Sequence, residues 1–284
     1  MKRKQVFIAV GIILLLAMVY WAISYQFGRE TDFNKKANVK IADTVSKDSL
    51  KAEISIPKPD YKWQPEVKDF SLEDVERLSQ SVYDTVSNAA IGDMPGDTIQ
   101  REFNSLVFFQ ANTDLYGIAV AENRAPFYGA SVGWCDVFVF KKENGNWQRT
   151  DFMLNAGGGG MYGNPGEFEK LVLTGDHSVG IVLTGGQEHM GSNYHHDVIN
   201  LQNGKLSNLV HITTYHNYGE GAGDDFKLVI CESNTYSFEP NGKSVYDLKI
   251  IKNNCLLEKN VKVAEVTIPY KKGYKIPKQF EFEN

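Results

Sequence analysis

All six histidines of this 284-residue chain lie in one stretch, between positions 177 and 216. Imidazole nitrogens combined with carboxylate oxygens suit zinc, copper, nickel or iron, and Glu188 and Asp197 stand close to the histidines. His177 falls in a predicted tight turn, at the opposite end from the long loops. We therefore expect a site for zinc or another divalent transition metal, with these candidate ligands: His189, His195, His196 and His216.

The spacing of these histidines matches no established metal-binding motif. The stretch contains no H-E-x-x-H and no closed Cys/His spacing. His195 and His196 are adjacent, so on a strand their side chains would point to opposite sides. His211 is placed on a predicted strand that leads into a loop. The alternative interpretation is that the histidines are polar loop residues that hydrogen-bond to the backbone.

Aromatic residues gather in or beside the predicted long loops. Tyr and Trp are favoured at protein interfaces because they supply large contact areas at low entropic cost. Aromatic loops can also simply cover the ends of a sheet. We expect the following residues to form a binding surface: Phe127, Tyr128, Trp134, Tyr162, Tyr194, Tyr215 and Tyr218.

The chain has three cysteines, Cys135, Cys231 and Cys255, and none is paired with a histidine as in a cysteine enzyme. Cys231 and Cys255 could form a disulfide and close a loop of about 25 residues. One objection is that they follow the first and third strands of one predicted unit, about 10 Å apart, which exceeds disulfide reach. Cys135 would then be a buried thiol.

Other motifs do not carry catalysis. Residues 129–133 fit G-x-S-x-G, but a nucleophile elbow needs a strand before it and a helix after it, and here a strand follows. The glycine run 157–160 has no G-K-[ST] and opens no helix, so it predicts a flexible loop instead of a phosphate site. The acidic residues of segment 220–225 match no EF-hand. We assign no catalytic residue, and the chain is not expected to be an enzyme unless it binds a metal.

The elements that must position these residues are mainly β-strands. From position 105 onward, apolar runs alternate with tight turns, including Asn-Gly pairs at 144–145 and 203–204 that are typical of hairpins. The pattern predicts three repeated four-stranded antiparallel meander units, the third with a turn at 232–234. These units would form a curved sheet or an open, sandwich-like stack. A propeller-like arrangement is disfavoured because four blades are the usual minimum.

The direction of the strands places the long loops together. In a meander, the loops 122–134, 155–166, 185–195 and 214–224 all leave the same end of the sheet. Long loops at one end of a rigid scaffold are where binding sites usually lie. The sequence therefore predicts that the aromatic and histidine candidates share one end of the domain.

One helix precedes the strands. Ser71 and Asp74 form a capping-box pattern, and apolar residues recur at spacings of three and four from Leu72 to Val86. This helix is predicted to cover one face of the sheet and to carry no chemistry.

The N-terminal segment is predicted to be a membrane anchor. Residues 5–27 carry no charge, and basic residues precede them, which is typical of a single-pass helix with a cytoplasmic N-terminus. A cleaved signal peptide is the alternative. The chain then divides into a signal-anchor helix (1–28), a polar tether (29–66) and an extracytoplasmic, mainly-β domain (67–284) on the inner membrane, facing the periplasm.

Net charge narrows the class of partner. Three of the 30 basic residues stand in the first four positions, so the rest of the chain has 27 basic against 35 acidic residues, a net charge of −8. This sign disfavours nucleic acid and favours a basic protein partner. We therefore expect a membrane-anchored binding protein of inhibitor or immunity type. The alternatives are a metal-dependent enzyme or metal-binding protein that uses the histidines, and an accessory subunit of an envelope complex.

Overall fold

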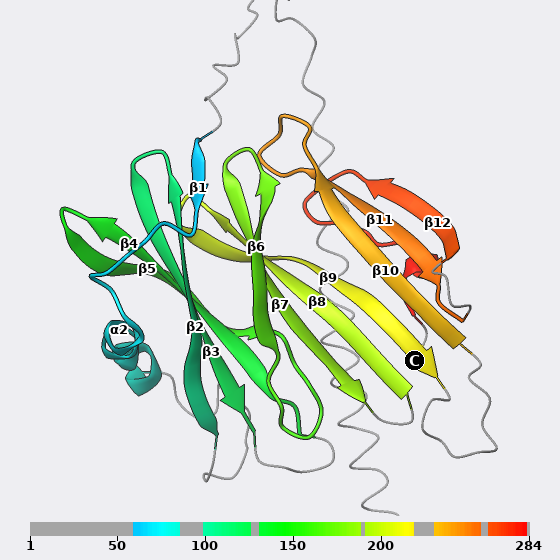
Figure 1. Cartoon of the computed structure of the whole chain (residues 1–284), viewed down its shortest axis with the longest axis horizontal. Helices are drawn as coiled ribbons and strands as arrows, with labels where there is room; N and C mark the ends of the chain where they lie inside the picture. Colours follow the sequence, from blue (N-terminus) through cyan, green and yellow to red (C-terminus); the bar gives the residue numbers. More distant parts are fainter. Residues whose placement is uncertain are drawn as a thin grey trace, which may run out of the picture. The chain divides into compact units, whose positions relative to one another are not determined.

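The computed structural model describes residues 59–85, 99–125, 131–188, 191–218, 230–256 and 261–282 (Figure 1). The predicted anchor, residues 1–28, lies outside these ranges. Among the described residues, no helix is long and apolar enough to cross a bilayer. Residues 56–284 form one compact unit, which contains every strand and helix described below together with its core.

The prediction of a mainly β fold with one covering helix is confirmed. The first sheet has five antiparallel strands in sequence order: β1 (Tyr61–Trp63), β2 (Gln100–Ala111), β3 (Asp114–Arg124), β4 (Trp134–Glu143) and β5 (Asn146–Gly157). Strand β1 belongs to the segment that the sequence assigns to the tether, and it pairs with the far end of β2.

The second sheet has seven antiparallel strands, again in sequence order. Its first four strands are β6 (Glu167–Gly175), β7 (Ser178–Glu188), β8 (Gly191–Gln202) and β9 (Lys205–Tyr218). The last three are β10 (Ile230–Glu239), β11 (Asp247–Asn254) and β12 (Val261–Ile268), and a short 3₁₀ helix, η2 (Lys278–Phe280), follows them.

The third predicted unit is not separate from the second. Strand β9 pairs with β10 from Ile230↔Tyr218 to Ser233↔Tyr215, so the two units share one sheet. The turn predicted at 232–234 is wrong, because these residues lie inside β10 and pair with β11. Asn234 is buried, and its side-chain amide donates to the carbonyls of Thr213 and Phe280 instead of forming a turn.

The single strand β10 removes the objection to the disulfide. Strand β10 pairs directly with β11, and Cys231 and Cys255 lie opposite each other next to the Glu232↔Asn254 end of this ladder. Their Cα–Cα distance is 5.0 Å. The structure joins them in a disulfide, and the Cys255 amide donates to the Cys231 carbonyl. Cys135 is a buried free thiol.

The hydrophobic core lies between the two sheets. Side chains such as Ile118 and Val137 from the first sheet pack against Ile181, Leu183 and Ile199 from the second. Because strand side chains alternate between faces, their neighbours Ala119 and Phe138 point the other way and pack against the helix α2 (Leu72–Thr85). The predicted capping box is formed, since the Ser71 amide donates to Asp74 and the Asp74 amide donates to Ser71.

The seven-stranded sheet curls toward closure (Figure 1). The connection between β10 and β11 hydrogen-bonds to the β6–β7 hairpin: the Tyr246 amide donates to the Thr174 carbonyl at 2.7 Å, and the Asp176 amide donates to the Lys243 carbonyl at 3.0 Å. One face of β8 therefore looks toward the first sheet, and the other face looks into the curl. This division decides which side chains can meet.

Candidate metal centre

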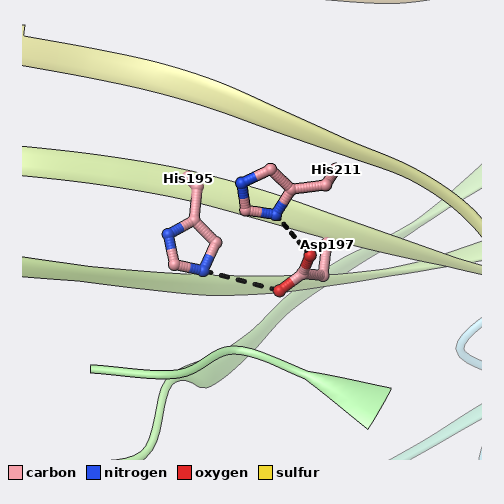
Figure 2. Close-up of side chains that lie close together, drawn as sticks. All are labelled: His195, Asp197 and His211. Carbon is pink, nitrogen blue, oxygen red and sulfur yellow. Dashed lines mark hydrogen bonds and ion pairs between the residues drawn. The ribbon is translucent and has the colours of Figure 1, made fainter. Parts of the chain in front are cut away.

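The structure brings together three side chains, His195, Asp197 and His211, on one face of the β8–β9 hairpin (Figure 2). His195 and Asp197 are two residues apart on β8, so their side chains share a face. Asp197 stands opposite His211 in the β8–β9 register. The three potential ligand atoms, two imidazole nitrogens and one carboxylate oxygen, all lie within 4.8 Å of one another.

The carboxylate of Asp197 is the centre of this cluster. His211 Nδ1 lies 2.7 Å from Asp197 Oδ1, and His195 Nε2 lies 3.5 Å from Oδ2. The two rings contact each other, with centroids 4.6 Å apart. The backbone amide of Gly158 donates to Oδ2 at 2.8 Å and fixes the carboxylate from the side of the β5–β6 loop.

Glycines allow the backbone to approach the cluster. A Cβ at Gly157, where φ is +132°, would lie 2.5 Å from Asp197 Oδ2. A Cβ at Gly185 would lie 2.4 Å from His195 Nε2. Both distances are far shorter than an ordinary van der Waals contact, so any larger residue would displace a member of the cluster. The glycine run 157–160, predicted to be a flexible loop, therefore helps to position Asp197.

The protonation states follow from these contacts. Burial alone would raise the pKa of Asp197, but hydrogen bonds from His195, His211 and the Gly158 amide outweigh it and hold that pKa well below its usual range. The hydrogen bond to Asp197 raises the pKa of His211, against the burial that would lower it. The cluster thus contains an ionised carboxylate at neutral pH, which is the form that a metal requires.

The cluster borders a hollow of about 280 Å³. His195 and His211 line it, together with the polar side chains of Gln187, Asn193 and Thr213. The His211 side chain is 59% exposed, whereas those of His195 and Asp197 are 19% and 18% exposed. An ion at the cluster would therefore be bound by two mostly buried side chains, His195 and Asp197, and would remain accessible to solvent from the hollow.

Of the four histidines predicted as ligands, the described structure places one in the cluster. His195 is a member. His196 points to the opposite face of β8 and contacts Tyr236, as expected for adjacent strand residues. His216 lies further along β9, where it stacks on Phe282, and it is not part of the cluster. His189 lies outside the described residues.

Sequence reasoning did not select two members of the cluster, Asp197 and His211. The signal was present in the hairpin itself, because the Asn203-Gly204 turn fixes which residues of β8 and β9 face each other. Counting outward from that turn brings His211 opposite His196, the neighbour of Asp197. A register shift between Val198 and Ile199 then selects Asp197.

The predicted aromatic surface is divided among several places. Tyr162 and Tyr194 line a second hollow, of about 330 Å³, which shares Gly160, Met161 and Gln187 with the first. The rings of Tyr194 and Tyr215 lie 5.9 Å apart. Trp134 starts β4, Tyr218 is exposed at the end of β9, and Phe127 and Tyr128 lie outside the described residues.

Two imidazoles and one carboxylate make a donor set that holds zinc or a related ion and leaves a coordination position open for water or another ligand. The nearest polar side chains, Gln187, Asn193 and Thr213, can donate hydrogen bonds to such a ligand but do not titrate at neutral pH. The chemistry that this arrangement can supply is thus metal binding, with access from one side. In comparisons with protein-family models, curated proteins and solved structures, none matches this chain.

Proposed function

We propose that the β domain binds a divalent transition metal ion, of the zinc class, through His195, Asp197 and His211. The observation that carries the proposal is the convergence of three ligand atoms within 4.8 Å at the edge of a hollow. The Gly158 amide, which orients the carboxylate, is the kind of supporting contact that metal sites use to fix their ligands. A bound ion would take the place of the proton that His211 Nδ1 shares with Asp197 in their hydrogen bond. We therefore expect metal binding to release protons.

We place this domain outside the cytoplasm, tethered to the membrane by the N-terminal segment. The Cys231–Cys255 disulfide supports this location, because disulfides persist in oxidising compartments and are rare in the cytosol. The uncharged run at residues 5–27 supplies the anchor.

The test is metal content and titration of the 56–284 unit, secreted through an oxidising compartment. We expect about one equivalent of metal per chain by elemental analysis. We also expect saturable absorption bands when Co²⁺ is titrated into protein that has been stripped and dialysed. His211→Ala and Asp197→Asn should each abolish the bands, because each removes one of three ligands.

His196→Ala is the matched control, since it changes the adjacent histidine on the opposite face of the same strand. It should bind Co²⁺ as the unaltered protein does. Absence of Co²⁺ binding, or binding that survives both ligand substitutions, would refute the proposal.

A second candidate, capture of a protein partner by an inhibitor or immunity-type module, rests on exposed apolar side chains at the same end of the domain. Tyr218 and Ile230 are direct cross-strand partners and are 46% and 40% exposed. A Tyr218→Ser/Ile230→Ser variant should lose a partner that the unaltered domain retains from an envelope extract. Val263→Ser, at an exposed residue of β12, is the control.

A further inference from the structure

The opposite face of β8 carries a second, independent group of side chains. His196 points into the curl of the seven-stranded sheet, where a hollow of about 520 Å³ is lined by residues of β6, β8, β9 and β10. These strands can be followed in Figure 1. Val172 and Phe238 provide apolar walls, and His196, Tyr236 and Lys170 provide polar groups.

The strand pairing explains why this space exists. The ladder between β9 and β10 ends at Ser233↔Tyr215, although both strands continue beyond it. From Asn234 onward β10 pairs only with β11. The connection after β10 is bonded to the end of β6 by the Tyr246 amide. The sheet therefore closes toward β6 and leaves a gap between β9 and β10, which side chains fill only in part.

Three polar groups form a directed chain at one end of the hollow. His196 Nε2 lies 3.2 Å from Glu169 Oε2, and His196 Nδ1 lies 2.9 Å from the Tyr236 hydroxyl. A carboxylate can only accept a hydrogen bond, so the proton that faces Glu169 lies on His196 Nε2. A neutral imidazole has one donor and one acceptor. Nε2–H therefore donates to Glu169, and the Tyr236 hydroxyl donates to Nδ1.

This series of hydrogen bonds leaves one acceptor, the hydroxyl oxygen of Tyr236, for a ligand. The Tyr236 hydroxyl donates its hydrogen bond to His196, and its oxygen can still accept one. Among the described residues that line the hollow, the one cation is Lys170. It pairs with Glu169 at 2.9 Å, so the local charges offset each other. The walls are mostly apolar, which is typical of small-molecule sites in the mouths of curled sheets and barrels.

We propose that this hollow is a binding site for a small, uncharged and largely apolar molecule that donates one hydrogen bond to Tyr236. The site does not depend on the metal cluster, because the two groups lie on opposite faces of β8. Apolar burial supplies the affinity, and the His196–Tyr236 pair selects a ligand with a donor at one end.

The test uses N-phenyl-1-naphthylamine, a neutral, environment-sensitive fluorophore with a single N–H donor, and the 56–284 unit. We expect a saturable fluorescence increase and a rise in the melting temperature. Val172→Trp should abolish binding by filling the hollow. Tyr236→Phe, which preserves the ring, should weaken binding about fivefold through loss of one hydrogen bond. The anionic analogue 1-anilinonaphthalene-8-sulfonate should bind at least about tenfold more weakly, because its charge would be buried without a partner.

His195→Ala separates this proposal from the metal site, since it should abolish Co²⁺ binding and leave fluorophore binding unchanged. Circular dichroism verifies the fold of each variant, and Tyr236→Phe keeps the test valid if Val172→Trp fails to fold. The proposal is overturned if the fluorophore does not bind saturably, if Tyr236→Phe binds it as tightly as the unaltered protein, or if the sulfonate binds equally well.

Discussion

Gly185→Ala should disable the metal centre without changing any of its ligands. The new Cβ would lie 2.4 Å from His195 Nε2 and 2.6 Å from the Gly159 carbonyl oxygen. Since nonbonded carbon contacts are normally about 3.5 Å, the ring must retreat by about 1 Å. It would then leave the Asp197 carboxylate, from which it is already 3.5 Å away. The φ of Gly185 lies outside the left-handed region, so the effect is steric and not a backbone strain.

The magnitude follows from comparable perturbations. Displacing a ligand through its supporting contacts typically costs about 10- to 100-fold in metal affinity, and overpacking lowers the free energy of unfolding by about 1–3 kcal/mol. Co²⁺ titration measures the affinity, and urea denaturation measures the stability. The matched control is Gly180→Ala on the same strand, whose Cβ would lie 2.6 Å from Thr174 Cγ2 on the other face. It should lose similar stability and keep its metal. Equal Co²⁺ affinity in both variants would refute the reasoning.

Three further predictions concern stability and reactivity. Replacing Cys231 and Cys255 by Ser should lower the free energy of unfolding in urea by about 3.5 kcal/mol, as expected for opening a loop with a sequence separation of 24; a loss below about 1 kcal/mol would contradict it. Burial raises the pKa of Cys135 to about 12, so iodoacetamide at pH 8 should label it, by mass spectrometry, only after unfolding. In the metal-free protein, the lowered pKa of Asp197 stabilises the fold above the ordinary value of 3.8, and the raised pKa of His211 stabilises it below the ordinary value of 6.5. His211→Gln should therefore lower the free energy of unfolding in urea more at pH 5.5 than at pH 8. The difference should stay below about 1 kcal/mol because His211 is largely exposed; an equal loss at both values would contradict it.

Local signals in the sequence predict most of the scaffold. The Asn-Gly turns are formed where expected, with positive φ at Asn144, Gly145, Asn203 and Gly204. The amphipathic pattern and capping box of α2 are likewise local, and the structure contains both. These features depend on residues a few positions apart, so pattern and propensity decide them.

Long-range contacts account for what the sequence did not reveal. Asn234 resembles a turn residue, but its side chain satisfies carbonyls 21 and 46 positions away. The pairing of His196 with Tyr236 spans 40 positions and depends on how far the sheet curls. His195 was selected because histidines gather in and beside one predicted long loop, whereas His211 required the exact partner across the hairpin.

The alternation of side chains along β8 also limits how this chain can change. A substitution at His195 or at His196 alters one site and leaves the other in place. A single residue inserted between Asp197 and the Asn203-Gly204 turn would act differently. The apolar residues next to the turn would keep their register, and every residue before the insertion would move to the opposite face of the strand. His195 and Asp197 would turn into the curl, and His196 would turn toward the first sheet. Changes of length in this hairpin therefore remove both sites together, whereas changes of residue type can tune each one alone.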